Sequence, residues 1–333
     1  MSLNQLERTL INHYQGSFPL TEQPFRSVAS YLGCAESTLL DTVGRLLDGG
    51  ILSRFGPLYD AVKLGGGLTL AAMSVPEPHY DRVTEQVNDF AEVAHNYRRE
   101  HTLNMWFVVA TASPGQIDHA LQQIQQLTGF RVYSFPKQHE FYVGLWLKLD
   151  ASNRVSTVPL PTAVTTTAVS STGDYAPDEL DRRIINATQA GLPLASAPYQ
   201  AIAQVCLCSS QQVKQRMQHM LECGIIRRIG AVPNHYRLGL MANGMTVWDI
   251  ADDQAMALGS RIGQLDFVSH CYLRPRHQPV WPYNLFAMVH GRTRDEVNDK
   301  AEQIAAITGS NSRAHETLFS SAILKKTGMR LVA

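Results

Sequence analysis

The sequence predicts an α+β protein built as a tandem repeat, in which each copy joins a winged helix-turn-helix to a ferredoxin-like (βαββαβ) domain. Three observations support this prediction: residues recur at a constant offset of 174 positions, the first part of each copy has apolar residues at helical spacing, and the second part alternates strand and helix patterns. The matched positions include Ile11-Asn12 with Ile185-Asn186, Pro19-Leu20 with Pro193-Leu194, Gly50-Ile51 with Gly224-Ile225, and Leu64-Gly65 with Leu238-Gly239. Chance does not produce so many matches at one offset.

The copies and the stretch between them divide the chain into five segments. The stretch between the copies is rich in Ser, Thr and Pro and lacks helical periodicity, which predicts an unstructured linker. The predicted segments are a winged helix-turn-helix (1–60), a ferredoxin-like ligand domain (61–150), the linker (151–177), a second winged helix-turn-helix (178–234) and a second ferredoxin-like ligand domain (235–333).

The first part of each copy has the pattern of three short helices and a wing. Leu6 and Leu10 predict an early helix, and Leu39 and Val43 predict a later one that ends at Gly49-Gly50. The stretches ILSRFGPLYDAV and IIRRIGAVPNHY are each expected to form a β-ribbon, the wing of that copy.

The second part of each copy has the order of a split βαβ unit. In the first copy LTLAAMSV predicts a strand, Tyr80 and Val83 mark a helix face, and two strands lie around HNYRREHTLNMWFVVA. A second helix turns Ile117 and Leu121 inward, and the last strand is expected in FYVGLWLKL. This order is the ferredoxin-like pattern.

Composition and charge exclude some classes of function. The 333 residues are 44% hydrophobic and 17% charged with a formal net charge of zero, which is typical of a soluble globular protein without the basic excess of nucleic-acid binders. No apolar run approaches the roughly 20 residues of a membrane helix and no leader pattern occurs, so a cytoplasmic location without a membrane partner is expected. The second helix-turn-helix offers Lys214 and Arg216 and the first only Arg45, so DNA is not an expected partner.

One polar pattern recurs in both ligand domains. It is His-x-Tyr-x-Arg, present as His95, Tyr97 and Arg99 and again as His270, Tyr272 and Arg274. Alternate residues of a strand share a face, so each triplet forms one row, which His101 extends in the first copy. Arg binds carboxylates, His can donate a proton near neutral pH, and Tyr adds an uncharged hydrogen bond. The rows therefore predict a site for a carboxylate-bearing ligand. The alternative is a set of solvent-facing strand residues, which recurrence in both copies disfavours.

Longer motifs around these rows carry a resemblance to a known family. They are HNYRREHTLNMWF in the first copy and SHCYLRP…WPYNLFAMVHG in the second, with IIRRIGAVPNHYRLG in support. Apart from the linker, the chain resembles two fused subunits of siroheme decarboxylase, a Lrp/AsnC-like family that acts on the way to haem d1 in denitrifiers. The two-copy arrangement is similar to the fused D–L type of that family. The resemblance implies ligand domains of the Lrp/AsnC type, with related G and H type subunits as partners, or a homo-oligomer.

The same resemblance implies an activity. It is a carboxy-lyase reaction that converts siroheme to 12,18-didecarboxysiroheme by loss of carbon dioxide from two acetate side chains. No separate cofactor is implied, because the siroheme substrate carries its own iron.

The resemblance also implies roles for individual residues. His95 and His270 are expected to be proton donors or axial ligands of the substrate iron, two roles that the sequence does not separate. Tyr97 and Tyr272 would orient the substrate, and His101 is a further catalytic candidate. The predicted substrate-binding residues are Arg98, Arg99, Asn104, Trp106, Arg274, Arg276, Trp281 and Asn284, with Phe107 and Phe286 as further apolar walls.

Two other functions fit the same domains. A transcriptional regulator of the Lrp/AsnC type, or a tetrapyrrole sensor, would bind its ligand in the ferredoxin-like domain and DNA through the helix-turn-helix. A siroheme carrier would need the same pocket but no proton donor.

Overall fold

In the computed structural model, which describes residues 3–161 and 175–326, each copy begins with three helices and one strand. These are α1 (Gln5–His13), α2 (Pro24–Leu32), α3 (Glu36–Asp48) and β1 (Leu52–Tyr59), then α7 (Glu179–Thr188), α8 (Pro198–Cys206), α9 (Ser210–Glu222) and β9 (Ile226–Pro233). Equivalent residues start equivalent helices: Asn4 and Asp178 each form a capping box at the first helix of their copy. The predicted repeat of helix-turn-helix units is confirmed.

The predicted wings are wrong in one respect. Each copy contributes a single strand, and β1 pairs antiparallel with β9 of the other copy, with Gly56 opposite Gly230. Both glycines have positive φ, and a Cβ at Gly56 would lie 2.8 Å from the backbone nitrogen of Leu192. The strands thus pack closely against the other copy's helical segment, and the two helix-turn-helix units share one hydrophobic core.

The ligand domains both have the predicted ferredoxin-like order. The first contains β2 (Gly67–Met73), α4 (Tyr80–Asp89), β3 (Val93–Arg99), β4 (Met105–Thr111), α5 (Ile117–Thr128) and β5 (Val132–Pro136). The second contains β10 (Ala242–Ile250), α10 (Asp252–Gly263), β11 (Val268–Leu273), β12 (Leu285–Gly291), α11 (Arg294–Thr308) and β13 (Ser312–Lys326). Short 3₁₀ turns precede α4 (Glu77–His79) and α5 (Pro114–Gln116) and follow α11 (Gly309–Asn311).

The two domains form one continuous nine-stranded sheet. Its order is β5-β2-β4-β3-β13-β10-β12-β11-β6, where β6 (His139–Val143) follows β5 along the chain. The end of each domain joins it to the other: β13 pairs first with β10 and then with β3 of the first domain, and β6, which comes after the first domain's last strand β5, pairs with β11 of the second. The first copy's last strand is thus β5, not the predicted FYVGLWLKL, because the chain leaves its own sheet after Pro136.

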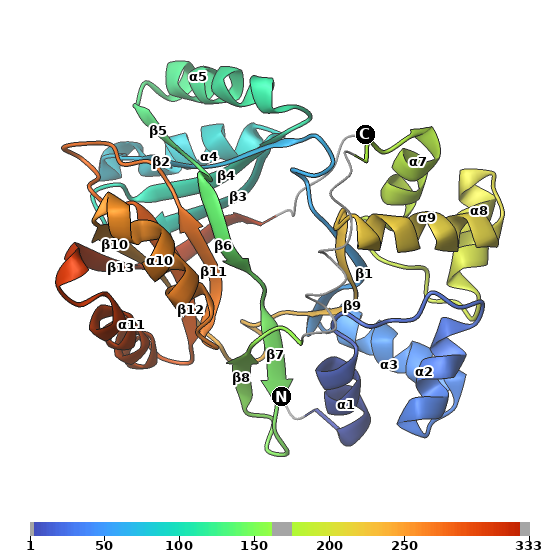
Figure 1. Ribbon diagram of the computed structural model, residues 1–333. Coiled ribbons are helices and arrows are strands. Elements are labelled where there is room, and N and C mark those ends of the chain that lie inside the picture. Colours follow the sequence, from blue (N-terminus) through green and yellow to red (C-terminus); the bar gives the residue numbers. More distant parts are fainter. Residues whose placement is uncertain (1–2, 162–174, 327–333) are drawn as a thin grey trace.

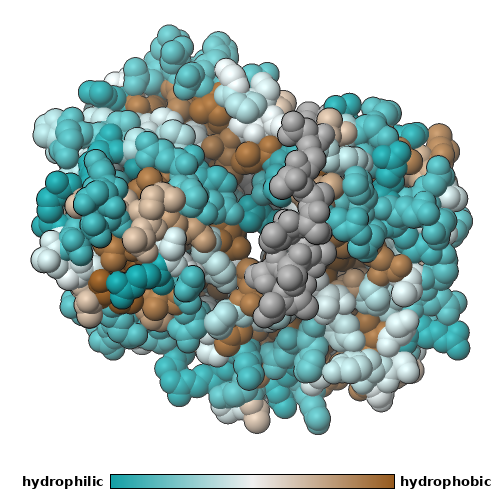
Figure 2. Space-filling view, viewed as in Figure 1, coloured by the Kyte–Doolittle hydropathy of each residue, from teal (hydrophilic) through white to brown (hydrophobic). Residues whose placement is uncertain are grey.

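Helices cover the outside of this sheet and leave its inner faces toward each other. In Figure 1 the ligand lobe stands beside the helix-turn-helix lobe, with α4 and α5 over one half of the sheet and α10 and α11 over the other. Separate apolar clusters fill the two helix-covered faces, and a third cluster lies between the inner faces. The surface in Figure 2 is mainly hydrophilic over both lobes, with apolar residues beside the hollow between them.

The predicted linker is only partly irregular. Its beginning contains β8 (Val155–Val158), which forms a hairpin with β7 (Trp146–Leu149), and β7 packs against α1. The prediction for residues 162–174 lies outside the described residues. Within the described ranges no helix combines the length and apolar character needed to cross a membrane. The cytoplasmic location stays a prediction.

Candidate functional site

A cavity of about 520 Å³ lies between the inner faces of the two ligand domains. Strands β2, β3 and β4 supply one wall, and β10, β11 and β12 supply the other. The helix-turn-helix lobe adds Arg54 and Tyr59 from β1 and Arg227 from β9, and the apolar cluster around Trp106 and Phe286 lies between the same inner faces. This volume is in the range of about 300–1,000 Å³ that is typical of ligand pockets.

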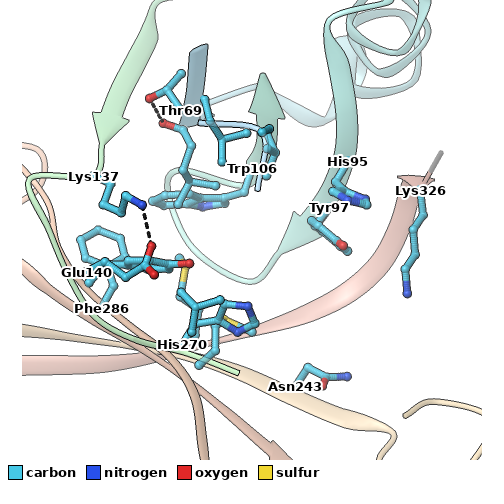
Figure 3. A pocket seen from close by; sticks show the side chains of 18 of the residues that line it. Thr69, His95, Tyr97, Trp106, Lys137, Glu140, Asn243, His270, Phe286 and Lys326 are labelled. Carbon is cyan, nitrogen blue, oxygen red and sulfur yellow. Dashed lines mark hydrogen bonds and ion pairs between the residues drawn. The ribbon is translucent and has the colours of Figure 1, made fainter. Parts of the chain in front are cut away.

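The first predicted row lines this cavity. His95, Tyr97 and Arg99 alternate along β3, and the rings of His95 and Tyr97 are stacked with centroids 6.2 Å apart. Figure 3 shows His95 and Tyr97 on the same side of the cavity, near Lys326. Burial, with a smaller contribution from the charge of Lys326, lowers the pKa of His95 to about 4, so its imidazole is neutral at pH 7.

The second predicted row faces the same cavity from β11. His270 and Tyr272 have ring centroids 6.1 Å apart, and the guanidinium carbon of Arg274 lies 4.7 Å from the centroid of Tyr272. Burial, and then the charge of Arg227, lowers the pKa of His270 to about 4. The two copies therefore do not form two separate sites: both rows meet in one cavity, with His270 across from His95 (Figure 3).

The two arginines of the rows have equivalent surroundings. Arg99 donates from Nη1 to the carbonyl oxygen of Leu318 in β13 at 2.6 Å, and Arg274 donates from Nη1 to that of Phe135 in β5. The Nε atom of each is buried and has no hydrogen-bond partner among the described residues. Burial lowers the pKa of each guanidinium to about 10, yet both stay charged at pH 7. Arg99 is buried and Arg274 is partly buried, and each is a cation with an unused donor.

The lining of the cavity is positively charged overall. Its cationic side chains are Arg54, Arg99, Lys137, Arg227, Arg274 and Lys326. Its carboxylates are Asp60 and Glu140, and both pair with Arg227, at 2.7 and 3.3 Å. Lys137 also pairs with Glu140. Within the described part of the chain the other four cations form no ion pair, so the cavity favours a ligand with several negative charges.

Two predicted arginines lie outside the cavity. Arg98 points to the opposite face of β3, where it pairs with Glu77 at 2.6 Å and lies over the Tyr80 ring, because neighbouring strand residues alternate in direction. Arg276 pairs with Asp249 and Asp252 beyond the end of β11. Their positions do not support the predicted substrate contacts in this cavity.

The two asparagines predicted to bind substrate, Asn104 and Asn284, form hydrogen bonds with the backbone instead. Asn104 accepts from the Val75 nitrogen at 2.9 Å and donates to the Val75 carbonyl at 2.8 Å. Asn284 makes the same pair of bonds with Ile250, at 2.9 and 3.0 Å. These amides join neighbouring strand ends at equivalent places in the two copies, which accounts for their recurrence without a ligand.

Three further predicted residues also fall outside the lining. His101 follows the end of β3, where the chain turns, and its Nε2 lies 3.6 Å from Glu316. Phe107 points to the helix-covered face, and Trp281 is fully buried in the cluster between the sheets. Trp106 and Phe286, by contrast, do line the cavity.

The sequence analysis missed several polar residues of the cavity. They are His235, Tyr236, Asn243, His290 and Lys326, which all belong to the second copy. Matching the repeats could not reveal them, because the first copy has Ala61 and Val62 at the places of His235 and Tyr236. The signals were NHYRLG, which contains His235 and Tyr236, and the end of WPYNLFAMVHG, which contains His290; both contributed to the family resemblance, but these residues received no role.

Lys214 and Arg216, the two cations of α9, are already paired. Lys214 pairs with Glu22, and Arg216 pairs with Asp178 at 2.8 Å and Asp181 at 3.4 Å. Their charge is therefore partly neutralised within the protein, which does not favour contacts with DNA phosphates.

Two known protein families match four segments of this chain, which correspond closely to its two helix-turn-helix units and two ligand domains. Residues 63–142 and 237–325 match the AsnC-like ligand binding domain, and residues 7–52 and 181–227 match the siroheme decarboxylase NirDL-like HTH domain.

Individual relatives agree with these matches. A siroheme decarboxylase of Hydrogenobacter thermophilus is 30% identical over 318 residues, covering 95% of this chain and 92% of that protein. The siroheme decarboxylase NirH subunit of Paracoccus pantotrophus is 58% identical over 156 residues, 47% of this chain and 97% of that subunit. The crystal structure of the siroheme decarboxylase NirDL in co-complex with an iron-uroporphyrin III analogue has 27% identity and a TM-score of 0.70, covering 97% of this chain and 92% of that one.

Proposed function

Because the chain belongs to the siroheme decarboxylase family, we propose that it converts siroheme to 12,18-didecarboxysiroheme, a step of haem d1 biosynthesis, by removing carbon dioxide from two acetate side chains. The observation that carries the proposal is the single cavity with two arginines, Arg99 and Arg274, whose Nε atoms are buried and which have no carboxylate partner among the described residues. Siroheme is a macrocycle with several carboxylates, and a guanidinium is the side chain best suited to bind one.

The reaction balances with one proton for each carbon dioxide released. The bond between the acetate methylene and its carboxylate breaks, carbon dioxide leaves, and the electron pair stays on the methylene carbon. That carbon takes up a proton and becomes a methyl group. No electrons are gained or lost overall, so the proposal includes no separate cofactor, and the iron belongs to the substrate.

Apolar side chains of the cavity favour loss of the carboxylate. Trp106, Met245, Phe286 and Met288 line the same space as the two rows. A carboxylate is less stable in apolar surroundings than in water, while its charge spreads out as the bond breaks. The arginines would then hold carboxylates that do not react and so fix which acetate lies against these walls.

The imidazoles of His95 and His270 are the side chains of the two rows that are best suited to supply the proton. Both His95 and His270 are neutral at pH 7 in the free protein, with pKa values lowered to about 4. The carboxylates of a bound siroheme would favour the protonated form and raise these values toward neutrality. Each histidine can thus supply a proton or, while neutral, bind the substrate iron.

Anaerobic turnover of siroheme tests the proposal directly. The purified chain should convert siroheme to a product lighter by two molecules of carbon dioxide, as followed by mass spectrometry. The double variant His95→Ala, His270→Ala should lose turnover, whereas Arg98→Ala, outside the cavity, should keep it. Binding of siroheme without any release of carbon dioxide would instead identify a carrier or sensor.

Partner subunits are a separate part of the proposal. The NirH relative covers about half of this chain, so one chain corresponds to two such subunits, and both rows already lie in one cavity. We therefore propose that a single chain forms the site and that G and H type subunits, or a second copy, bind outside it. Addition of such subunits should then leave turnover per chain unchanged. The regulator alternative predicts a mobility shift with DNA, which the paired Lys214 and Arg216 disfavour.

A further inference from the structure

A chain of hydrogen bonds connects His270 to Asn243 through two other residues. Nδ1 of His270 lies 2.9 Å from the Ser269 hydroxyl, which lies 2.7 Å from Nε2 of His290. Nδ1 of His290 in turn contacts Oδ1 of Asn243. Ser269, His290 and Asn243 are all buried, so these groups depend on one another for their hydrogen bonds.

The Asn243 oxygen at the end of these hydrogen bonds determines which atom donates and which accepts in each of them. Burial, followed by the charges of neighbouring groups, keeps the pKa of His290 well below its usual value, so its ring is neutral and carries one proton. An amide oxygen only accepts, so that proton is on Nδ1 and Nε2 is an acceptor. The Ser269 hydroxyl therefore donates to His290, since its other acceptor, the Met288 carbonyl, is more distant at 3.4 Å.

The same reasoning determines the tautomer of His270. With its single proton given to His290, the Ser269 oxygen can only accept from Nδ1 of His270. His270 is neutral at pH 7, so its one proton is on Nδ1 and its Nε2 has a free lone pair. His270 lines the cavity (Figure 3). Its Nδ1 is occupied by Ser269, so Nε2 is the nitrogen available to a ligand.

The first copy cannot form this chain. The residue before His95 is Ala94, where the second copy has Ser269 before His270. In the paired strands Leu68 lies opposite Ala110, where the second copy has Asn243 opposite His290. Nδ1 of His95 is buried and has no hydrogen-bond partner among the described residues, so no neighbour determines its tautomer.

We propose that Asn243, His290 and Ser269 are positioning residues that hold His270 with an unprotonated Nε2, and that this nitrogen binds the iron of siroheme. The proton-donor role then falls to His95 in the opposite row. Iron-binding histidines commonly donate their other ring N–H to a fixed acceptor, which orients the ring and makes it a better ligand. The identity of the ligand rests on the proposed function, whereas the tautomer does not.

Nitrogen-15 NMR of histidine-labelled free protein tests the tautomer without a ligand. His270 should show a protonated Nδ1 and an unprotonated Nε2, assigned by comparison with His270→Gln. Ser269→Ala and His290→Ala should each let His270 populate the other tautomer. Both changes install the residue that the first copy carries at the same place, so the strands should tolerate them. Cys271→Ala, on the opposite face of β11, should leave the His270 signals unchanged. An Nε2 protonated in the wild type would overturn the proposal.

Binding of siroheme and of its iron-free form, sirohydrochlorin, tests the ligand. The wild type should bind siroheme with an absorption spectrum of histidine-bound iron. His270→Ala should lose that spectrum and regain it with added imidazole, whereas His95→Ala should keep it. Ser269→Ala, at a residue outside the cavity lining, should weaken siroheme binding by roughly tenfold or more and leave sirohydrochlorin binding unchanged. Loss of the spectrum in His95→Ala instead of His270→Ala would refute the assignment.

These results separate the inference from the proposed function. A spectrum that depends on His270 without release of carbon dioxide would support iron binding and refute decarboxylation. Release of carbon dioxide with a spectrum independent of His270 would do the reverse.

Discussion

The two rows that face each other across the cavity have the same three residue types but different support. On β3, Ala94 and Ala110 occupy the positions that Ser269 and His290 have in the second copy. The Nδ1 atom of His95 has no hydrogen-bond partner among the described residues. On β11, His270 is held by Ser269 and, through it, by His290. The comparison teaches that a repeated motif identifies the residues that touch a ligand, while the unrepeated residues behind it set the chemistry of each copy.

Replacement of Arg99 or Arg274 should have the largest effect, a weaker affinity for siroheme. The loss of affinity should be similar for the two arginines. Arg99→Ala and Arg274→Ala each remove charged hydrogen bonds to a carboxylate, which are worth about 1.5–3 kcal/mol, or roughly ten- to a hundredfold in the Kd for siroheme. Titration followed by absorbance measures this. The free energy of unfolding should not fall as it does when a buried ion pair is broken, because neither guanidinium has a carboxylate partner in the described protein. An unchanged Kd would remove that arginine from substrate binding.

Substitution of the tyrosines should have a smaller effect on turnover, and one that differs between the two copies. Tyr97→Phe and Tyr272→Phe delete one hydroxyl each, which is worth about 0.5–1.5 kcal/mol, or roughly two- to tenfold in kcat. Steady-state rates with siroheme would provide the comparison. Because we assign the proton donor to the first row, Tyr97→Phe should slow turnover more than Tyr272→Phe, and the opposite order would contradict that assignment.

The pH dependence of stability should reveal both histidines in the free protein. Each has a folded-state pKa of about 4, below the unfolded value of about 6.5. Their contribution to stability is therefore complete at pH 7 and is lost as the pH falls from about 6.5 toward 4. His95→Gln and His270→Gln should each reduce the slope of unfolding free energy in that window, by up to about 1.4 kcal/mol per pH unit. Urea unfolding at several pH values measures the slopes, and unaltered slopes would show that the histidines are not shielded from water.

The smallest effect is expected from Arg98→Ala, beside Arg99 in the sequence. Its ion pair with Glu77 is exposed, so stability should change by less than about 1 kcal/mol and siroheme affinity should stay the same. This variant is the matched control for Arg99→Ala. A loss of affinity similar to that of Arg99→Ala would mean that the ligand also reaches the outer face of β3.

The sequence was sufficient for the local architecture and the two rows. Periodicity predicted the helix-turn-helix and ferredoxin-like units, and strand alternation placed His95, Tyr97 and Arg99 on one face, as the structure confirms. The same alternation places Arg98 on the other face, so its position outside the cavity does not support its assignment to the substrate. His101 was assigned by extending the row past Arg99, where β3 in fact ends.

The pairing between the copies was beyond the sequence. Hydrophobic periodicity identifies strands but not their partners, so neither the β1–β9 pair nor the crossing of β6 and β13 could be predicted. The single cavity follows from that pairing. For the same reason the contact between His290 and Asn243 could not be predicted, because these residues become neighbours only through the β10–β12 register.

The crossing of β6 and β13 between the domains has a consequence for how the protein depends on its own concentration. Two separate subunits with this sheet would have to meet in solution before either had a complete site, and dilution would drive them apart. One polypeptide replaces that encounter with an intramolecular one at a high effective concentration. Assembly of the site should therefore be equally complete in dilute and concentrated solution. A cell would also not need to make two different polypeptides in matching amounts.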